Sequence, residues 1–352
     1  MKIVNIILTS QNGGAEQAFV DYLVVLKKLG HEVLTIVKTD APYAEQISAL
    51  GIEVKKIKNR FGYHDIFAVK EIAKILHDFD ANIAMAHIGR SMVLVNKAIK
   101  KIKKEVLLIA VNHSMNVRRS VGADVIFSVN KKAFHRTIDL GQAVDKSFVI
   151  PNAIDLEGAV ENPPEVDLRK KETVIIGAMA RIDDKKGFEY LIKAIAKLKQ
   201  SPQKFILKIA GSGAYETKLR ELAKELNVEN EVEFLGWIKN KKEFFASIDI
   251  FCSASDNETF GLVLLEAMKY CKPIIATNTD GSKEVLYSEI DGLIIDLKPI
   301  ASLEDRIISA ILKFVNEPEF LNLLVKNGAK KVREKYSYQA LENRMKEIVG
   351  KG

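Results

Sequence analysis

The first 150 residues alternate short β-branched runs with longer amphipathic stretches. Runs such as KIVNIIL, HEVLTIV and EVLLIAV have the length and composition of buried strands, whereas AEQAFVDYLVVLKKLG carries apolar residues at helical spacing. Strands that alternate with helices indicate βα units around a parallel sheet. The first half of the chain therefore predicts an α/β domain.

This alternation stops at residues 155–171 and then resumes. The segment DLEGAVENPPEVDLRKK contains two adjacent prolines and a charge cluster, which are typical of a linker, and TVIIGAM, GFEYLIKAIAKLK and FILKIAG follow it. We expect two Rossmann-like, doubly wound domains, one over 1–158 and one over 159–335. The last segment, 336–352, is helical by periodicity and follows no strand, so we expect it to pack back toward the first domain.

Length and composition are those of a globular protein with more than one core. At 352 residues the chain exceeds the usual size of a single core, and it contains no apolar run of spanning length and no basic-then-apolar leader. We therefore expect a cytoplasmic protein. Cys252 and Cys271 stand in apolar surroundings without a CxxC or Cys/His pattern, which predicts buried, reduced thiols and no zinc site.

Charge is uneven along the chain. Residues 1–160 hold 22 Lys+Arg against 16 Asp+Glu, and the remainder holds 31 against 30, so most of the net charge of +7 lies in the first half. A pI of 9.0 raises the question of nucleic acid. The basic residues are neither concentrated nor interleaved with aromatic ones, so we expect no nucleic-acid partner.

Glycine-rich turns follow several predicted strands, where ligands of parallel sheets bind. Gly13 and Gly14, in QNGGAEQ, let the backbone approach a ligand, although a tight turn explains them equally well. Gly211 opens the turn AGSGAYE, which begins like a dinucleotide fingerprint. Glu216 stands where the third glycine should be, which makes a nicotinamide enzyme a weak interpretation.

Two cations follow the strand TVIIGAM. Arg181 lies just past the strand, and Lys186 precedes Gly187 at the start of the next helix. A forked guanidinium and an ammonium at such a position form an anion site. The neighbouring Lys185, Asp183 and Asp184 favour the alternative, a solvated loop.

The stretch DNETFGLVLLEAM places two carboxylates around a helix start. Free amides of Phe260, Gly261 and Leu262 predict an anion site at the helix N-terminus. Glu258 precedes the helix and would reach a ligand, with a solvated turn as the alternative. Glu266 lies inside an apolar helix, where its carboxylate needs donors such as vicinal sugar hydroxyls, or else a salt bridge.

In this order and at these spacings, the motifs resemble those of the retaining glycosyltransferases of family 4, which have the two-domain GT-B fold. Glu258 and Glu266 match the E-x7-E motif, and Arg181 and Lys186–Gly187 match the family's arginine and lysine-glycine pair. The segments NGGAEQAFVDYLVVLKKLGHEV, IPNAID, KIAGSGAYETKLRELAKEL, VEFLGW and TDGSKEVL match further signatures over nearly the whole chain.

The resemblance implies a role for each matched position. Arg181 and Lys186 would hold the donor diphosphate, and the amides of residues 260–262 would complete that cradle. Glu258 would contact the transferred sugar and Glu266 the nucleotide ribose. The glycine turns would approach the donor through Gly13, Gly14 and Gly211.

The implied reaction moves a hexose-type sugar from a nucleoside diphosphate, UDP before GDP, to a hydroxyl with retention. His113, in VNHSMN, matches the histidine near the reacting sugar, whereas His87 is as well explained by a structural role at a strand end. The leaving phosphate can take the acceptor proton, so the resemblance implies no cofactor and no metal. We interpret Asp78-Phe79-Asp80 as a solvated helix terminus.

Several positions depart from the family pattern. Ala153 and Ala254 replace a glycine and a proline, and Asp280 replaces a glycine near the predicted donor site, where it would affect sugar choice. Cys271 stands where a glycine usually ends the motif helix. We expect it to cap that helix through a different local turn.

The acceptor is expected on the first domain, which carries the basic excess. The run NKAIKKIKKE, with Lys97, Lys100, Lys101, Lys103 and Lys104, would place Ile99, Ile102 and Val106 on one side of a basic helix. Such a surface suits an anionic membrane at the inner face of the cytoplasmic membrane, although a solvated helix explains it equally well. We expect a glycolipid or cell-surface glycan acceptor of the lipopolysaccharide core type. A nucleotide-sugar 2-epimerase on the same fold remains the alternative, and the intact E-x7-E, Arg181 and Lys186 set argues against it.

Overall fold

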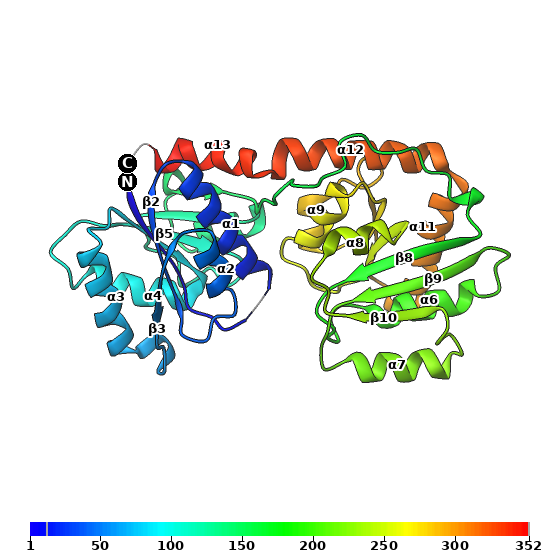
Figure 1. Ribbon diagram of the computed structural model, residues 1–352, viewed down its shortest axis with the longest axis horizontal. Helices are drawn as coiled ribbons and strands as arrows, with labels where there is room; N and C mark the ends of the chain where they lie inside the picture. The colour runs from blue at the N-terminus through cyan, green and yellow to red at the C-terminus, as the bar shows by residue number, and fades with distance from the viewer. Residues whose placement is uncertain (12, 351–352) are drawn as a thin grey trace. The chain divides into compact units, whose positions relative to one another are not determined.

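The computed structural model describes residues 1–11 and 13–350. Its contacts divide the chain into two compact units: unit 1 comprises Met1–Asp155 together with the residues from Ser337 onward, and unit 2 comprises Leu156–Tyr336. The sequence had suggested boundaries at 158/159 and 335/336. Each unit is built around one parallel sheet (Figure 1).

Unit 1 contains a seven-stranded sheet in the order β3-β2-β1-β4-β5-β6-β7. Its strands are β1 Lys2–Ile7, β2 Glu32–Lys38, β3 Glu53–Ile57, β4 Ile83–His87, β5 Leu107–Asn112, β6 Val125–Ser128 and β7 Ser147–Val149. Its helices are α1 Gly14–Lys28, α2 Ala44–Ala49, α3 Ile66–Asp78, α4 Ile88–Ile99, α5 Lys131–Asp139 and α13 Tyr338–Val349, with short 3-10 turns η1 Gly62–His64 and η2 Val144–Lys146.

Unit 2 contains a six-stranded sheet in the order β10-β9-β8-β11-β12-β13. Its strands are β8 Thr173–Met179, β9 Lys204–Ala210, β10 Val232–Gly236, β11 Ile250–Ser253, β12 Ile274–Thr277 and β13 Leu293–Ile295. Its helices are α6 Phe188–Leu198, α7 Glu216–Glu225, α8 Lys241–Ala246, α9 Leu262–Lys269, α10 Asp280–Val285, α11 Leu303–Asn316 and α12 Pro318–Tyr336, with 3-10 turns η3 Leu168–Lys170 and η4 Ile300–Ser302. Two doubly wound parallel sheets confirm the predicted fold class.

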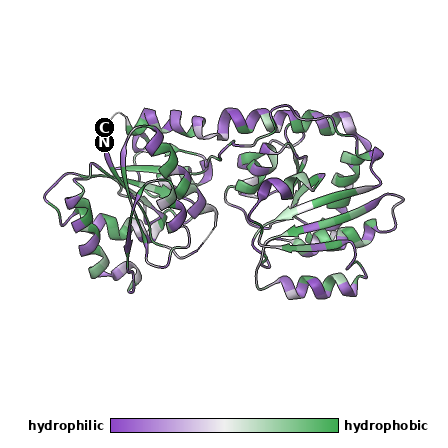
Figure 2. Ribbon diagram, in the orientation of Figure 1, coloured by the Kyte–Doolittle hydropathy of each residue, from purple (hydrophilic) through white to green (hydrophobic). Residues whose placement is uncertain are grey.

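Successive residues of the central strands face opposite sides of the sheet. In β1, Ile3 packs with residues of α1 and α13, whereas Val4 packs with residues of α3 and α4. Helices therefore cover both faces, which agrees with the predominantly apolar colouring of the central strands in Figure 2.

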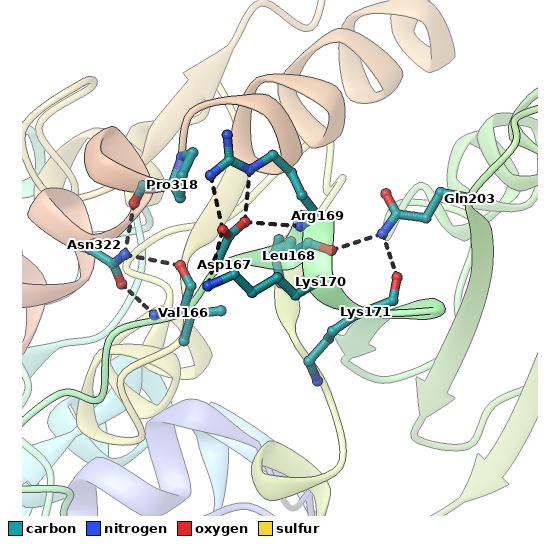
Figure 3. Close-up of polar contacts among 9 residues, drawn as sticks. All are labelled: Val166, Asp167, Leu168, Arg169, Lys170, Lys171, Gln203, Pro318 and Asn322. Atoms are coloured by element: carbon teal, nitrogen blue, oxygen red, sulfur yellow. Dashed lines mark hydrogen bonds and ion pairs between the residues drawn. The ribbon is translucent and has the colours of Figure 1, made fainter.

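The chain enters unit 2 through an anchored segment (Figure 3). Asn322 of α12 exchanges two hydrogen bonds with the backbone of Val166, each 2.9 Å long. Gln203 donates to the carbonyls of Leu168 and Lys171, at 2.8 and 2.9 Å. These bonds fix the segment that leads into β8.

The C-terminal helix α13 belongs to unit 1, as the expected return of the chain requires. Leu341, Met345 and Val349 are buried in one cluster with Ile3 and Tyr22. The helix thus completes the core on one face of the first sheet.

Two sequence expectations are wrong. Cys271 was expected to end α9 through a turn unlike that of a glycine. It instead adopts the left-handed conformation typical of a glycine after a helix, with φ +53°, and its amide donates to Met268 O at 3.1 Å. The lysine run does not form one helix, because α4 ends at Ile99. Ile99 and Ile102 pack against the core and Val106 is buried, so no apolar side remains for a membrane.

Both cysteines are buried and free, which confirms their predicted burial. Burial raises the pKa of the Cys252 thiol to about 12. Asp80 ends the turn after α3 in a left-handed conformation and forms an exposed ion pair with Lys104, as a solvated helix terminus should.

Candidate functional site

The predicted donor residues leave the carboxyl edge of the unit 2 sheet. From β8 the chain winds outward to β10 and then crosses to β11, on the other side of β8. Open parallel sheets bind ligands at such a change of direction. Arg181 and Lys186 follow β8 and Glu258 follows β11, so these residues flank the switch point.

Lys186 and Glu258 are in contact. Lys186 Nζ donates to Glu258 Oε2 at 3.0 Å, and the two side chains are only 18% and 29% exposed. Their loops are also joined through the backbone, since Asp256 N donates to Lys185 O at 2.9 Å. The pair places one positive and one negative group, each compensated by the other, at the switch point.

Arg181 precedes Lys186 in the same loop after β8, and its side chain is much more exposed than those of the pair. Its Nε donates to Asp183 Oδ2 at 3.0 Å, and its side chain is 71% exposed. The guanidinium has four further N–H donors, which is the donor set that a diphosphate requires. The predicted anion-binding cations are therefore both at the carboxyl edge, one half-buried and one in solvent.

Glycines hold the loops of this edge against one another. Gly187 caps α6 with φ +65°, and a Cβ there would lie 2.1 Å from Ala254 O in the loop after β11. A Cβ on Gly211 would lie 1.9 Å from Ala180 O in the loop after β8. Backbone packing alone explains both glycines, so the donor-binding role of Gly211 stays a prediction.

The start of α9 is fixed next to Glu258. Gly261, with φ +86°, caps the helix, which begins at Leu262, and Phe260 is buried. Gly281 N donates to Glu258 O at 2.7 Å, which joins the start of α10 to the same bend. The first amides of a helix have no intrahelical acceptor, so this end of α9 can bind an anion.

Glu266 forms the salt bridge that the sequence left open as its alternative. Its carboxylate pairs with Nζ of Lys241, the first residue of α8, and its side chain is 14% exposed. Sequence reasoning missed Lys241, because nothing in the sequence shows that the loop after β10 lies beside α9. The ribose-binding role of Glu266 stays a prediction.

In unit 1 the glycine turn follows β1. Gly13 N donates to Glu16 Oε2 at 2.9 Å, and Gly14 is the first residue of α1. Asn12 of the same turn lies outside the described residues. The switch point of the first sheet lies between β1 and β4, so this turn has the expected position.

His113 is paired with His87. His87 Nδ1 and His113 Nε2 are 2.8 Å apart, and the planes of the two rings are nearly parallel, at 20° to each other. Burial lowers the pKa of His113 to about 4, and burial with the neighbouring His113 lowers the pKa of His87 well below its ordinary value. Both rings are therefore neutral near pH 7, one donating and one accepting the shared proton.

The described residues contain neither a metal-ligand cluster nor a membrane-spanning helix. No group of three or more His, Cys, Asp or Glu side chains is arranged to hold a metal ion. No helix of residues 1–11 and 13–350 combines the length and the apolar character needed to cross a bilayer.

Two family models match the chain. The one described as "Glycosyltransferase Family 4" matches residues 12–157, and the one described as "Glycosyl transferases group 1" matches residues 161–331. Together they account for the whole chain except its first residues, a short connection and the C-terminal end.

Similar proteins support the same classification over full length. An uncharacterized glycosyltransferase of Haemophilus influenzae is 25% identical over 96% of both chains. The lipopolysaccharide core biosynthesis glycosyltransferase LpsD of Rhizobium meliloti is 23% identical, over 100% of this chain and 99% of its own. Anabaena Alr3699/HepE, solved in complex with UDP and glucose, aligns over 100% of both chains with a TM-score of 0.84 at 19% identity, a likeness of fold.

Proposed function

We propose a donor, a reaction and an acceptor for a chain that belongs to the glycosyltransferases, family 4 in its N-terminal half and group 1 in its C-terminal half. The donor is a nucleoside-diphosphate hexose, and the acceptor is a hydroxyl of a glycolipid or cell-surface glycan. The observation that carries this proposal is the Lys186–Glu258 pair at the switch point, with Arg181 and the start of α9 on the adjacent loops.

Arg181 and Lys186 bind the diphosphate. The exposed guanidinium can turn its free N–H groups to the phosphates, and the first amides of α9 supply further donors. A diphosphate bound near Lys186 also competes with Glu258 for the N–H donors of that ammonium, which weakens the Lys186–Glu258 hydrogen bond. The carboxylate of Glu258 is then available to accept hydrogen bonds from the sugar hydroxyls.

Glu266 keeps its salt bridge with Lys241 and also accepts hydrogen bonds from the ribose hydroxyls. A carboxylate has about four acceptor directions, so the salt bridge leaves room for two hydroxyl donors. We favour UDP over GDP because HepE, which shares the fold, was solved with UDP. Asp280, the first residue of α10, lies next to the Gly281–Glu258 contact and is proposed to affect the choice of sugar.

The reaction proceeds with retention and without a metal. The acceptor oxygen bonds to the anomeric carbon on the face from which the diphosphate oxygen departs, and that oxygen takes the acceptor proton. Glu258 and Glu266 are each held in an ion pair, which suits them to binding hydroxyls and not to nucleophilic attack. Charge on the leaving nucleotide is balanced by Arg181 and Lys186, so activity should survive EDTA.

The acceptor is proposed to bind unit 1, with His113 beside the reacting sugar. A lipopolysaccharide-core acceptor is favoured by the likeness to LpsD over the full chain. The positive charge of the first 160 residues suits an acceptor that carries phosphate.

The test compares two site variants with a matched control. Arg169 resembles Arg181, since its Nε donates to Asp167 at 2.9 Å, but it precedes β8 and so lies at the other edge of the sheet. We expect Arg181→Ala and Glu258→Ala to lower kcat/KM for nucleotide release from UDP-hexose about 10²- to 10³-fold, and Arg169→Ala to leave it unchanged.

Binding is measured separately by thermal stabilisation with UDP and GDP. At about 100 times Kd a nucleotide should stabilise the wild type by about 2.7 kcal/mol. If neither nucleotide stabilises the protein, the donor-site assignment is wrong.

A further inference from the structure

Three large apolar side chains stand in solvent within seven residues of unit 1. Phe61, Ile66 and Phe67 are 63%, 61% and 66% exposed. Scattered exposed hydrophobic residues need no explanation, but a group held together at one turn marks an interaction surface.

The turn that carries these side chains is rigidly built. The buried carboxylate of Asp65 accepts hydrogen bonds from the amides of Arg60, Phe61, Phe67 and Ala68, at 2.7, 3.2, 3.1 and 3.0 Å. It thereby caps α3 and closes the turn before it. The backbone on both sides of the turn is fixed by one side chain, so Phe61 and Phe67 are held outside by structure and not by disorder.

The rest of α3 shows that the apolar residues are not misplaced core. Ala68, Val69, Ile72 and Leu76 supply its core-facing side. Phe67, Lys70 and Lys74 are exposed at helical spacing on the other side. The outer side of α3 is therefore apolar at its start and carries charges of both signs further along, since Glu71 and Asp78 are exposed there too.

Cations from two other elements surround the turn. The guanidinium of Arg119 lies 4.2 Å from the ring centroid of Tyr63, and that of Arg90 lies 5.9 Å from the same ring. Lys97 of α4, which packs beside α3 (Figure 1), donates to Tyr63 O at 3.0 Å. Cation–π contact orients the two guanidinium groups without neutralising them.

These cations have no acidic partners within the described part of the chain. No ion pair there involves Arg60, Arg90 or Arg119, and Arg90 Nε is buried without a hydrogen-bond partner. The only acid between Lys58 and Lys70 is Asp65, whose oxygens are occupied by the backbone. The apolar group is thus bordered by more positive than negative charge, with Glu71 an exposed acid on the same side of α3.

We propose that this lipid-facing patch, made of Lys58, Arg60, Phe61, Ile66, Phe67, Lys70, Arg90 and Arg119, docks the protein on an anionic lipid bilayer. The three apolar side chains enter the interfacial region, and the cations contact lipid phosphates. Charge complementarity selects this occupant, because a bilayer with anionic headgroups offers both an apolar layer and phosphate at the required positions.

The place of the patch in the sheet connects it with the acceptor. The turn follows β3, Arg90 lies in the first turn of α4 after β4, and Arg119 follows β5, so all three lie at the carboxyl edge that also bears His113. The lysine run 100–104 lies between α4 and β5, at the amino edge. This assignment rests on the proposed function only where it implies that the acceptor hydroxyl is presented by a membrane-anchored lipid.

The test is sedimentation of the full chain with phosphatidylcholine vesicles, with and without 30 mol% phosphatidylglycerol. We expect binding to the anionic vesicles only, weakened by high salt. Phe61→Ser/Phe67→Ser should lower the partition coefficient at least tenfold, and Arg90→Gln/Arg119→Gln about fivefold for each charge removed.

Two controls are matched in chemistry and exposure. Leu323→Ser removes an apolar side chain that is 54% exposed on unit 2, and Lys100→Gln/Lys101→Gln removes two exposed cations of unit 1 outside the patch. Both should bind vesicles within about twofold of the wild type. Thermal stabilisation by UDP should be the same in all of these variants, which verifies folding.

Two results would overturn the proposal. One is vesicle binding by Phe61→Ser/Phe67→Ser equal to that of the wild type. The other is a concentration-dependent dimer of the wild type, lost in this variant, which would make the patch a contact between copies of the chain. Vesicle binding without stabilisation by UDP or GDP would instead refute the donor site and leave the patch in place.

Discussion

At the scale of single residues, the informative feature is the pairing of polar groups that the sequence left separate. His87 ends β4 and lies opposite Val111 of β5, which brings it next to His113 two residues later. One hydrogen bond between two imidazoles requires a donor nitrogen and an acceptor nitrogen. The pair can take one extra proton on an outer nitrogen and keep this bond, whereas a second would place N–H groups on both nitrogens of the contact and break it.

The pair predicts a loss of stability in acid. Both histidines have a pKa below the unfolded value of 6.5, so between pH 6.5 and about 4 the unfolded chain binds more protons than the folded one. Stability must then fall as pH falls, by at most about 1.4 kcal/mol per pH unit for each histidine. Urea unfolding at pH 7, 6 and 5 measures this slope.

Replacing both histidines should flatten that dependence. His87→Gln/His113→Gln keeps hydrogen-bonding groups but cannot titrate, so its unfolding free energy should change less between pH 7 and 5 than that of the wild type. His64→Gln, an exposed position of the same unit, serves as the control and should keep the wild-type slope. An unchanged slope in the double variant would show that the pair is protonated when folded.

At the scale of elements, the donor site depends on loops that contact one another through backbone atoms. The turn between β8 and α6 passes so close to the loop after β11 that only a glycine fits at position 187. Lys186 precedes this glycine directly, so the contact that constrains Gly187 also positions the Lys186–Glu258 pair.

Gly187→Ala should therefore damage the site more than an ordinary strained substitution. A left-handed alanine costs about 1–2 kcal/mol, and the clash with Ala254 O at 2.1 Å requires the loop to move as well. We expect a loss of unfolding free energy of more than 2 kcal/mol and a weaker stabilisation by UDP.

Gly158→Ala separates the two effects. Gly158 has nearly the same backbone conformation, φ +69° against +65°, but a Cβ there meets nothing within 4 Å. It should cost about 1 kcal/mol and leave UDP binding intact. Equal losses in the two variants would show that the contact with Ala254 does not constrain the loop.

Periodicity predicted the elements well because strands and helices are local. The predicted strands at 2–8, 173–179 and 205–211 correspond closely to β1, β8 and β9. The helix start predicted near Phe260 lies within two residues of the observed start of α9 at Leu262. Contacts between distant loops were not predictable in this way. The Glu266–Lys241 bond depends on the position of α8 beside α9, and the exposure of Phe61 depends on the capping of α3 by Asp65.

At the scale of the whole molecule, the chain builds unit 1 from both of its ends. Tyr338 donates its hydroxyl to the buried Asp21 of α1 at 2.6 Å, and Ser337 pairs with Ile154 in a parallel bridge. Unit 1 thus closes only after unit 2 has been synthesised. Its proposed acceptor side and lipid-facing patch depend on the last helix for a complete core.

A cavity left by truncating a buried side chain of α13 should consequently lower the stability of unit 1 and leave that of unit 2 unchanged. Leu341 is fully buried among residues of α1 and the first sheet, so Leu341→Ala should cost about 2–5 kcal/mol. Hydrogen exchange by mass spectrometry should show faster exchange in peptides from 1–155 and unchanged exchange in peptides from 156–336. Glu347→Ala, exposed on the same helix, should leave both sets unchanged. Faster exchange in unit 2 alone would mean that α13 stabilises the unit it follows in sequence, contrary to its packing.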